Sequence, residues 1–183
     1  MRVIAGSARR LNLVTPRGYS TRPTSDKVKE TLFNIINPYI YDSRFLDLFA
    51  GSGGIGIEAL SRGAREAVFI EKDKEAVSCI KKNIETTHFT ESSTVYPYDV
   101  FSTLYNLESY GAFDIIFMDP PYDNDYEKQV LKVLSKSPLV NEDTLIIVEA
   151  SVETDFSFVD SIGFQVDRVK EYKNNKHVFI SLI

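Results

Sequence analysis

Short apolar runs alternate with helical patterns through most of the chain, and this alternation restricts the possible folds more than any other feature. After residue 44 the pattern predicts strands at 45–50, 66–71, 93–98, 113–118 and 144–151. Apolar residues at helical spacing fill the intervals at 54–62, 74–85 and 126–137, while 101–110 is helical or irregular. Strand and helix in strict turn predict right-handed crossovers and a parallel sheet with helices on both faces.

Both ends of the chain depart from this alternation. Strand-like runs at 164–172 and 176–183 are separated by a short polar turn, which predicts a C-terminal antiparallel hairpin at the edge of the sheet. Near the N-terminus, apolar spacing predicts a helix that begins at Thr24 or Ser25 and ends at Asn37-Pro38. Runs before that helix could pair as a small β-hairpin that covers the sheet. We therefore expect an α/β fold with a mostly parallel seven-stranded sheet and an N-terminal hairpin and helix extension.

Length and composition fit one soluble domain. The 183 residues are 43% hydrophobic and 26% charged, and no run approaches the roughly 18 apolar residues of a membrane helix. We expect a single domain, 1–183, with an extension at 1–37 and a core at 38–183. Cys79 is the only cysteine, and the N-terminus lacks a secretion-signal pattern, so we expect a cytoplasmic protein.

The sequence gives no reason to expect a metal, a membrane contact or a dimer. The two histidines, His88 and His177, show no metal-ligand pattern, and we interpret both as incidental. A monomer without metal is therefore the expectation.

Charge is distributed unevenly along the chain. Residues 1–30 contain seven basic and two acidic side chains, which leaves fourteen basic against twenty-four acidic in the remainder. A basic arm on an acidic body suggests contact with a polyanion, although a solvated, mobile N-terminus would show the same pattern.

The first core strand leads into a glycine-rich turn. Gly51, Gly53 and Gly56 match G-x-G-x-x-G, in which glycines let a ligand approach the backbone and the next helix offers N–H groups to an anion. Glu71 ends the second strand about 20 residues later, where an acid can accept hydrogen bonds from ribose hydroxyls. Together these features predict an adenosine-containing ligand, and both NAD and S-adenosylmethionine satisfy them.

Asp99 and Val100 follow the third strand. Asp99 could accept a hydrogen bond from an adenine amino group while Val100 covers the ring. Asp99 could equally cap the helix that follows, and the two roles are compatible.

The fourth strand ends in Asp119-Pro120-Pro121-Tyr122. A conjugated amine is a poor nucleophile because its lone pair is delocalised. The Asp119 carboxylate and the Pro120 carbonyl can each accept an N–H hydrogen bond and draw such an amine toward pyramidal geometry. The prolines hold these acceptors rigid, and Tyr122 offers a face on which a flipped base can stack. The motif therefore favours methyl transfer to a planar amine, by positioning rather than by a metal or a covalent nucleophile.

Several segments together resemble a known family. DLFAGSGGIGIEALSRGA, FIEKD and FDIIFMDPPY are similar to the Rossmann-like class I S-adenosylmethionine methyltransferases that act on exocyclic amines. MRVIAGSARRLNL and TRPTSDKVKETLFNII resemble the bacterial guanine-N2 methyltransferases of 16S ribosomal RNA, the RsmD family. The resemblance implies methylation of a guanine N2 in 16S rRNA, with S-adenosylmethionine as cofactor and a small-subunit assembly intermediate as substrate.

The resemblance also implies roles for individual residues. The cofactor contacts would be Asp47, Phe49, Ala50, Gly51, Ser52, Gly53, Glu71, Asp99 and Val100. The residues that hold the target amine would be Asp119, Pro120, Pro121 and Tyr122. The RNA contacts in the basic arm would be Arg9, Arg10, Arg17, Arg22, Thr24 and Lys29.

Two alternatives remain open from the residues alone. The same chemistry could act on adenine N6, cytosine N4 or a glutamine amide, because the Asp-Pro-Pro-Tyr motif does not distinguish these amines. A noncatalytic module that binds a nucleotide such as NAD could also use the glycine turn and the acid after the second strand.

Overall fold

The computed structural model describes residues 1–17, 25–122 and 125–183. Its strands are β1 (Arg44–Leu48), β2 (Glu66–Ile70), β3 (Ser93–Tyr96), β4 (Ile115–Met118), β5 (Leu145–Ser151), β6 (Phe164–Glu171) and β7 (Asn175–Leu182). Its α-helices are α1 (Asp26–Ile40), α2 (Gly54–Ser61), α3 (Lys74–Thr87), α4 (Val100–Asn106) and α5 (Tyr126–Leu134). Within these ranges no helix combines the length and the apolar character that crossing a membrane requires.

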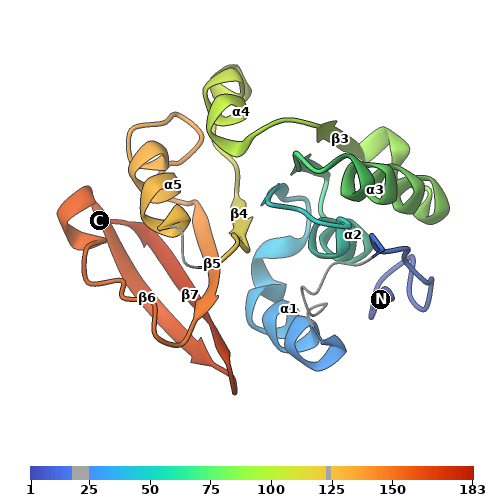
Figure 1. Cartoon of the computed structure of the whole chain (residues 1–183), viewed down its shortest axis with the longest axis horizontal. Helices are drawn as coiled ribbons and strands as arrows, with labels where there is room; N and C mark the ends of the chain where they lie inside the picture. The colour runs from blue at the N-terminus through green and yellow to red at the C-terminus, as the bar shows by residue number, and fades with distance from the viewer. Residues whose placement is uncertain (18–24, 123–124) are drawn as a thin grey trace.

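The described strands form one seven-stranded sheet in the order β3-β2-β1-β4-β5-β7-β6. Strands β1 to β5 run parallel, and β7 pairs antiparallel with both β5 and β6 (Figure 1). The chain moves outward from β1 to β3 and then returns to start β4 on the other side of β1. Strand order therefore reverses between β1 and β4, which is where α/β sheets of this kind bind ligands. The predicted fold class is confirmed, with β6 as the edge strand of the hairpin.

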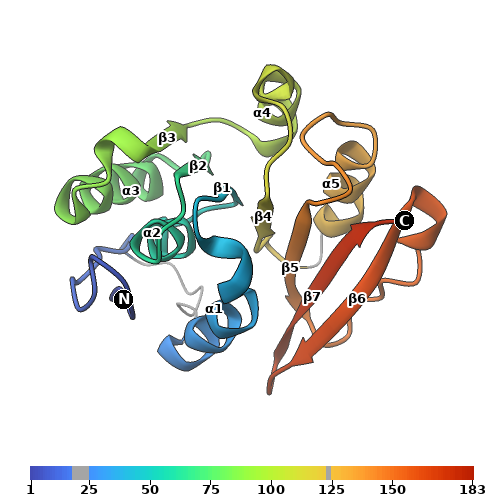
Figure 2. The same cartoon turned by 180° about the vertical axis from the view of Figure 1, so that it is seen from behind.

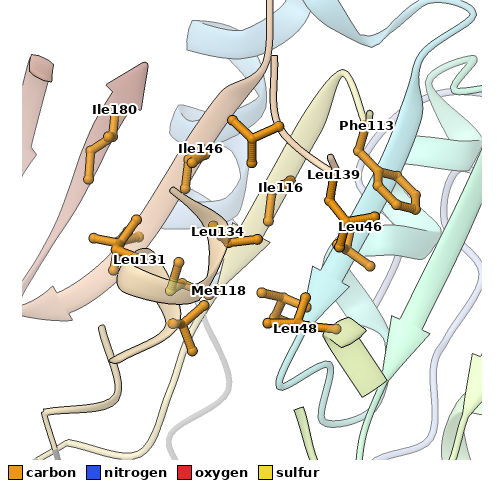
Figure 3. Close-up of a cluster of buried hydrophobic side chains, with 14 of the residues drawn as sticks. Leu46, Leu48, Phe113, Ile116, Met118, Leu131, Leu134, Leu139, Ile146 and Ile180 are labelled. Atoms are coloured by element: carbon orange, nitrogen blue, oxygen red, sulfur yellow. The ribbon is translucent and has the colours of Figure 1, made fainter. Parts of the chain in front are cut away.

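Side chains that alternate along the strands bury both faces of the sheet. Leu46 and Leu48 pack with α4 and α5, whereas Phe45 belongs to the cluster that contains α1, α2 and α3. Figure 3 shows the first of these clusters, where Ile116 and Met118 of β4 meet Leu131 of α5 and neighbouring strands. Figure 2 shows α1 and α5 on opposite sides of β4 and β5. Helices thus cover both faces of the central strands, and the carboxyl ends of the parallel strands are left to carry loops.

Helix α1 is longer than the sequence pattern predicts. The Ser25 hydroxyl caps it by accepting a hydrogen bond from the Val28 N–H, but the helix continues through Pro38 to Ile40. The predicted end at Asn37-Pro38 was wrong. Ile40 is fully buried in the cluster beneath α1, so packing of this last turn outweighs the hydrogen bond that proline removes.

The N-terminal segment is a looser structure than the predicted β-hairpin. It contains one antiparallel bridge, Arg2 with Asn12, rather than two paired strands. It also packs against helices and not directly over the sheet. The Ala8 N–H donates to the Ser61 hydroxyl of α2, and the Val14 N–H donates to the Asn83 side chain of α3. The segment is therefore fixed to the body by hydrogen bonds on two helices.

Candidate functional site

Three neighbouring parallel strands end together at the point where strand order reverses. Leu48 of β1 is in register with Ile70 of β2 and with Met118 of β4. Glu71 and Asp119 come directly after Ile70 and Met118, and the glycine turn begins three residues after Leu48. The structure thus brings the three predicted motifs to one edge of the sheet, which spacing alone had only suggested.

The glycine turn leaves open space where a ligand would need it. Gly51 has φ +55°, and a side-chain carbon built there would meet no atom within 4 Å. Phe49 also has a positive φ of 60°, a strained conformation for a non-glycine residue that often marks functional loops. At Gly56 a side-chain carbon would lie 2.4 Å from the Phe69 ring, so this glycine allows α2 to pack closely on β2. The turn can therefore admit a ligand at Gly51 while Gly56 fixes the helix behind it.

Glu71 ties the turn to the second strand. Its Oε2 accepts a hydrogen bond from the Gly51 N–H at 2.8 Å, and its Oε1 accepts one from the Asp73 N–H at 2.9 Å. The carboxylate is partly exposed and keeps unused lone pairs. It lies beside the open space at Gly51, as a ribose acceptor should. Its contact with a cofactor remains a prediction.

Asp47 supports the turn from beneath. Its side chain is 1% exposed and accepts a hydrogen bond from the Gly56 N–H at 2.9 Å. Burial, together with the nearby Glu71 charge, raises its pKa to about 7, and the Gly56 hydrogen bond partly opposes the rise. The observed role of Asp47 is to hold the start of α2, and a direct cofactor contact remains a prediction.

Ser52 is held by a residue that the sequence did not single out. The Asn83 amide donates to the Ser52 carbonyl and also to the Val14 carbonyl, each at 2.9 Å. Asn83 therefore connects the glycine turn, α3 and the N-terminal segment. Nothing in the local pattern of α3 could reveal this, because both partners are distant in sequence.

Asp99 caps a helix, as one of the two sequence interpretations expected. Its Oδ1 accepts a hydrogen bond from the Phe101 N–H at 2.9 Å at the start of α4. Asp99 is exposed and Val100 is buried in the core behind it. Contact of either residue with adenine remains a prediction.

The Asp119-Pro120-Pro121-Tyr122 segment follows β4, next to the strand that leads into the glycine turn. Pro120 is buried, whereas Pro121 and Tyr122 are exposed, Tyr122 by 42%. No hydrogen bond to the Asp119 carboxylate is present within the described residues.

The surroundings of Asp119 are strongly acidic. Burial raises the pKa of Asp119 well above its usual range, and the charges of Glu149, Asp47 and Glu127 raise it further. Partial desolvation of the Tyr122 hydroxyl and the Asp119 charge raise the pKa of Tyr122. Asp119 is consequently a stronger proton acceptor than a carboxylate in water.

One of these acids belongs to a buried chain of side chains. The Glu149 carboxylate contacts His177 Nε2 at 3.0 Å, and His177 Nδ1 lies 3.1 Å from the Tyr172 hydroxyl. His177 is fully buried on β7. His177 does not lie on the edge strand, because β7 lies between β5 and β6, and both of its ring nitrogens have partners.

The predicted RNA contacts have different environments. Arg9 and Arg10 are exposed and, with Arg2, line a surface concavity of about 370 Å³ that also contains Asp26 and Glu30. The side chain of Arg17 is exposed too, while its backbone N–H donates to Glu75. Arg22 and Thr24 lie outside the described residues.

Lys29 is the exception among these basic residues. It is 1% exposed, and its Nζ lies 3.1 Å from Glu58 and donates to the Arg2 carbonyl at 2.6 Å. This ammonium is enclosed beneath the N-terminal segment and does not face a phosphate. The prediction of Lys29 as an RNA contact was wrong, and its observed role is to anchor the arm.

Comparisons with known proteins agree along nearly the whole chain. A family model described as "Conserved hypothetical protein 95" matches residues 1–180. "Putative rRNA methyltransferase YlbH" of Bacillus subtilis is 42% identical over 93% of this chain and 92% of its own length. "Ribosomal RNA small subunit methyltransferase D" of Haemophilus influenzae is 39% identical over 81% of this chain and 78% of its own length. The solved structure "Putative methyltransferase yhhF from Escherichia coli" has a TM-score of 0.84 at 32% identity, and the match covers 100% of this chain and 97% of that chain.

Proposed function

Because the chain belongs to the family described as "Conserved hypothetical protein 95", the RsmD-type methyltransferases, we propose that it methylates ribosomal RNA with S-adenosylmethionine as methyl donor. The specific reaction that we propose is methylation of the exocyclic N2 amine of a guanine in 16S rRNA. The observation that carries the proposal is the register between β1 and β4, which places the glycine turn beside Asp119 and Pro120.

The residues at this edge fit an adenosine-type cofactor. The open space at Gly51 admits a ligand against the backbone, and the Glu71 carboxylate beside it can accept ribose hydroxyl protons. The start of α2 contributes N–H groups and the positive end of a helix dipole. When bound, S-adenosylmethionine supplies an electrophilic methyl group attached to a sulfonium centre.

Asp119 and Pro120 then act on the nucleophile. The Asp119 carboxylate and the Pro120 carbonyl can accept the two N–H hydrogen bonds of a guanine amine, which localises its lone pair for attack. Tyr122 is exposed next to them and can stack against the base. After methylation the nitrogen carries an extra proton, and the half-buried Asp119, which is surrounded by acids, is well suited to accept it.

Exposed arginines of the N-terminal arm provide the proposed RNA contact. Arg9 and Arg10 line the same concavity, and Arg17 lies further along the arm. A short arm offers few phosphate contacts, so we propose that a monomer acts on a partly assembled small subunit, where ribosomal proteins shape the RNA. A cytoplasmic location follows from that substrate.

The test is methyl transfer to small-subunit particles that lack the modification. Wild-type protein should label the particle with isotopic methyl, and mass analysis of the digested RNA should find N2-methylguanosine. Asp119→Asn should reduce the rate at least 100-fold, because the amide keeps one acceptor oxygen but carries no negative charge and cannot take up the amine proton. Asp143→Asn, an exposed turn residue, is the matched control and should retain full activity.

Calorimetry on the same variants separates binding from catalysis. S-adenosylhomocysteine should bind wild-type protein and Asp119→Asn within a few-fold of each other, and NAD should bind neither. Label in adenine or cytosine would overturn the guanine assignment. Binding of NAD without S-adenosylhomocysteine would favour a noncatalytic nucleotide-binding module.

A further inference from the structure

Three adjacent strands place a row of ionisable side chains behind Asp119. Met118 of β4 is in register with Val148 of β5, which pairs with Val178 of β7. These three residues are buried on the α4 and α5 face. Asp119 follows Met118 as Glu149 follows Val148, so alternation along the strands directs both carboxyl groups toward the opposite face, where the Glu149 charge acts on Asp119.

Glu149 is held in this row by the C-terminal hairpin. One carboxylate oxygen accepts a hydrogen bond from the Asn175 amide, and the other contacts His177 Nε2. His177 is in turn fixed by the Tyr172 hydroxyl at its Nδ1 and by the edge of the Phe117 ring. Both partners of Glu149 thus belong to the hairpin, and neither is part of the glycine turn or of the proposed cofactor contacts.

The hydrogen bonds of this chain are mutually consistent with a charged Glu149. Tyr172 can donate to His177 Nδ1, which leaves a proton on Nε2 to donate to Glu149. Glu149 and His177 are both buried, so a negative charge there is poorly screened by water. A poorly screened charge on the strand next to Asp119 acts strongly on Asp119.

We infer that Glu149, held by His177 and Asn175, is a positioning residue whose negative charge sets how readily Asp119 takes up a proton. The inference rests on the proposed role of Asp119 as acceptor of the amine protons. Through this chain the hairpin would keep Asp119 basic enough to hold the amine and to take its proton after methylation.

Other ionisable groups also face Asp119 and contribute to its environment. Asp47 acts from β1, Glu127 from α5, and Tyr122 from the same loop. Among the three acids the Glu149 charge has the largest effect in raising the pKa of Asp119. Removing it should therefore be detectable against the remaining charges.

Glu149→Gln is the decisive variant. Glutamine has the same shape, and it can still accept from Asn175 while donating to His177, because the imidazole can exchange its donor and acceptor nitrogens. The measurement is the carboxyl carbon signal of Asp119 against pH in the cofactor-free protein, assigned with Asp119→Asn. The midpoint should fall by about one pH unit, because a neighbouring like charge has been removed.

The acid limb of the pH profile for methyl transfer should move in the same direction. Glu171→Gln removes an equal charge from the exposed side of the same hairpin and should leave both midpoints unchanged. His177→Leu should lower the Asp119 midpoint, since Glu149 loses a hydrogen bond that favours its charged form, whereas His177→Gln should preserve it.

Two failures can be distinguished. If Asp119→Asn retains methyl transfer, the proposed role of Asp119 is wrong. Binding of S-adenosylhomocysteine will show that the Glu149→Gln protein is folded. If Asp119 is essential but its titration midpoint in that folded variant equals the wild-type midpoint, Glu149 only holds the hairpin in place and the inference is overturned.

Discussion

Among single residues, Asp47 holds the start of α2 and at the same time lowers the stability of the folded protein at neutral pH. Its pKa is about 7 in the folded protein, against an ordinary value of 3.8. Between pH 3.8 and about pH 7, Asp47 is protonated in the folded protein but ionised in the unfolded chain. The free energy of unfolding therefore falls as pH rises, by up to about 1.4 kcal/mol per pH unit. The acid that holds the start of α2 is therefore costly to keep charged at neutral pH.

Asp47→Asn should weaken this pH dependence. Urea unfolding of the cofactor-free protein between pH 5 and 7 should show a smaller loss of stability in the variant than in wild type. Some slope will persist, because the pKa of Asp119 is raised as well. Asp167→Asn, which alters an exposed carboxyl group on β6, should keep the wild-type slope. Equal slopes in Asp47→Asn and wild type would contradict the conclusion that burial raises the pKa of Asp47.

At the scale of elements, Glu58 of α2 connects three parts of the fold. Its carboxylate accepts hydrogen bonds from the N–H groups of Ile4 and Ala5, and it pairs with Lys29 of α1 and with Arg62. Both Glu58 and Lys29 are almost completely buried. This charged centre thus ties the N-terminal arm to α1 and α2, in addition to the hydrogen bonds of the arm with Ser61 and Asn83.

Glu58→Gln should be strongly destabilising for that reason. It leaves the buried Lys29 ammonium without its charge partner, which typically costs about 3–5 kcal/mol in the free energy of unfolding. Hydrogen exchange should also speed up in residues 1–17. Glu30→Gln, on the exposed side of α1, should change stability by less than about 0.5 kcal/mol. A similar small change in Glu58→Gln would show that the arm is held by other interactions.

The sequence predicts elements better than it predicts their partners. Strand and helix periods identified every strand of the sheet to within a few residues, because each depends on local alternation of apolar residues. Lys29 was misjudged because its ammonium group is buried against Glu58, a partner that is distant in the chain. His177 was misjudged because local pattern does not reveal which hairpin strand pairs with β5.

The molecule as a whole combines an acidic body with a basic arm, and this predicts salt-dependent RNA binding. Arg9→Ala or Arg10→Ala should weaken RNA binding and reduce the slope of log K against log salt by about one for each phosphate that the arginine neutralises. Affinity for S-adenosylhomocysteine should not change. Arg65→Ala removes an equal charge from an exposed residue that precedes β2, and should leave the salt slope intact. An unchanged slope in both arm variants would exclude these arginines as phosphate ligands.

If the proposed function is right, one edge of the sheet holds both the methyl donor and the amine that receives the methyl group. A crystal structure with S-adenosylhomocysteine and an rRNA fragment would show where each of them binds. We predict the cofactor sulfur next to the turn at Gly51, and the guanine amine between the Asp119 carboxylate and the Pro120 carbonyl. A cofactor bound away from that turn, or a base bound away from Asp119, would contradict the account.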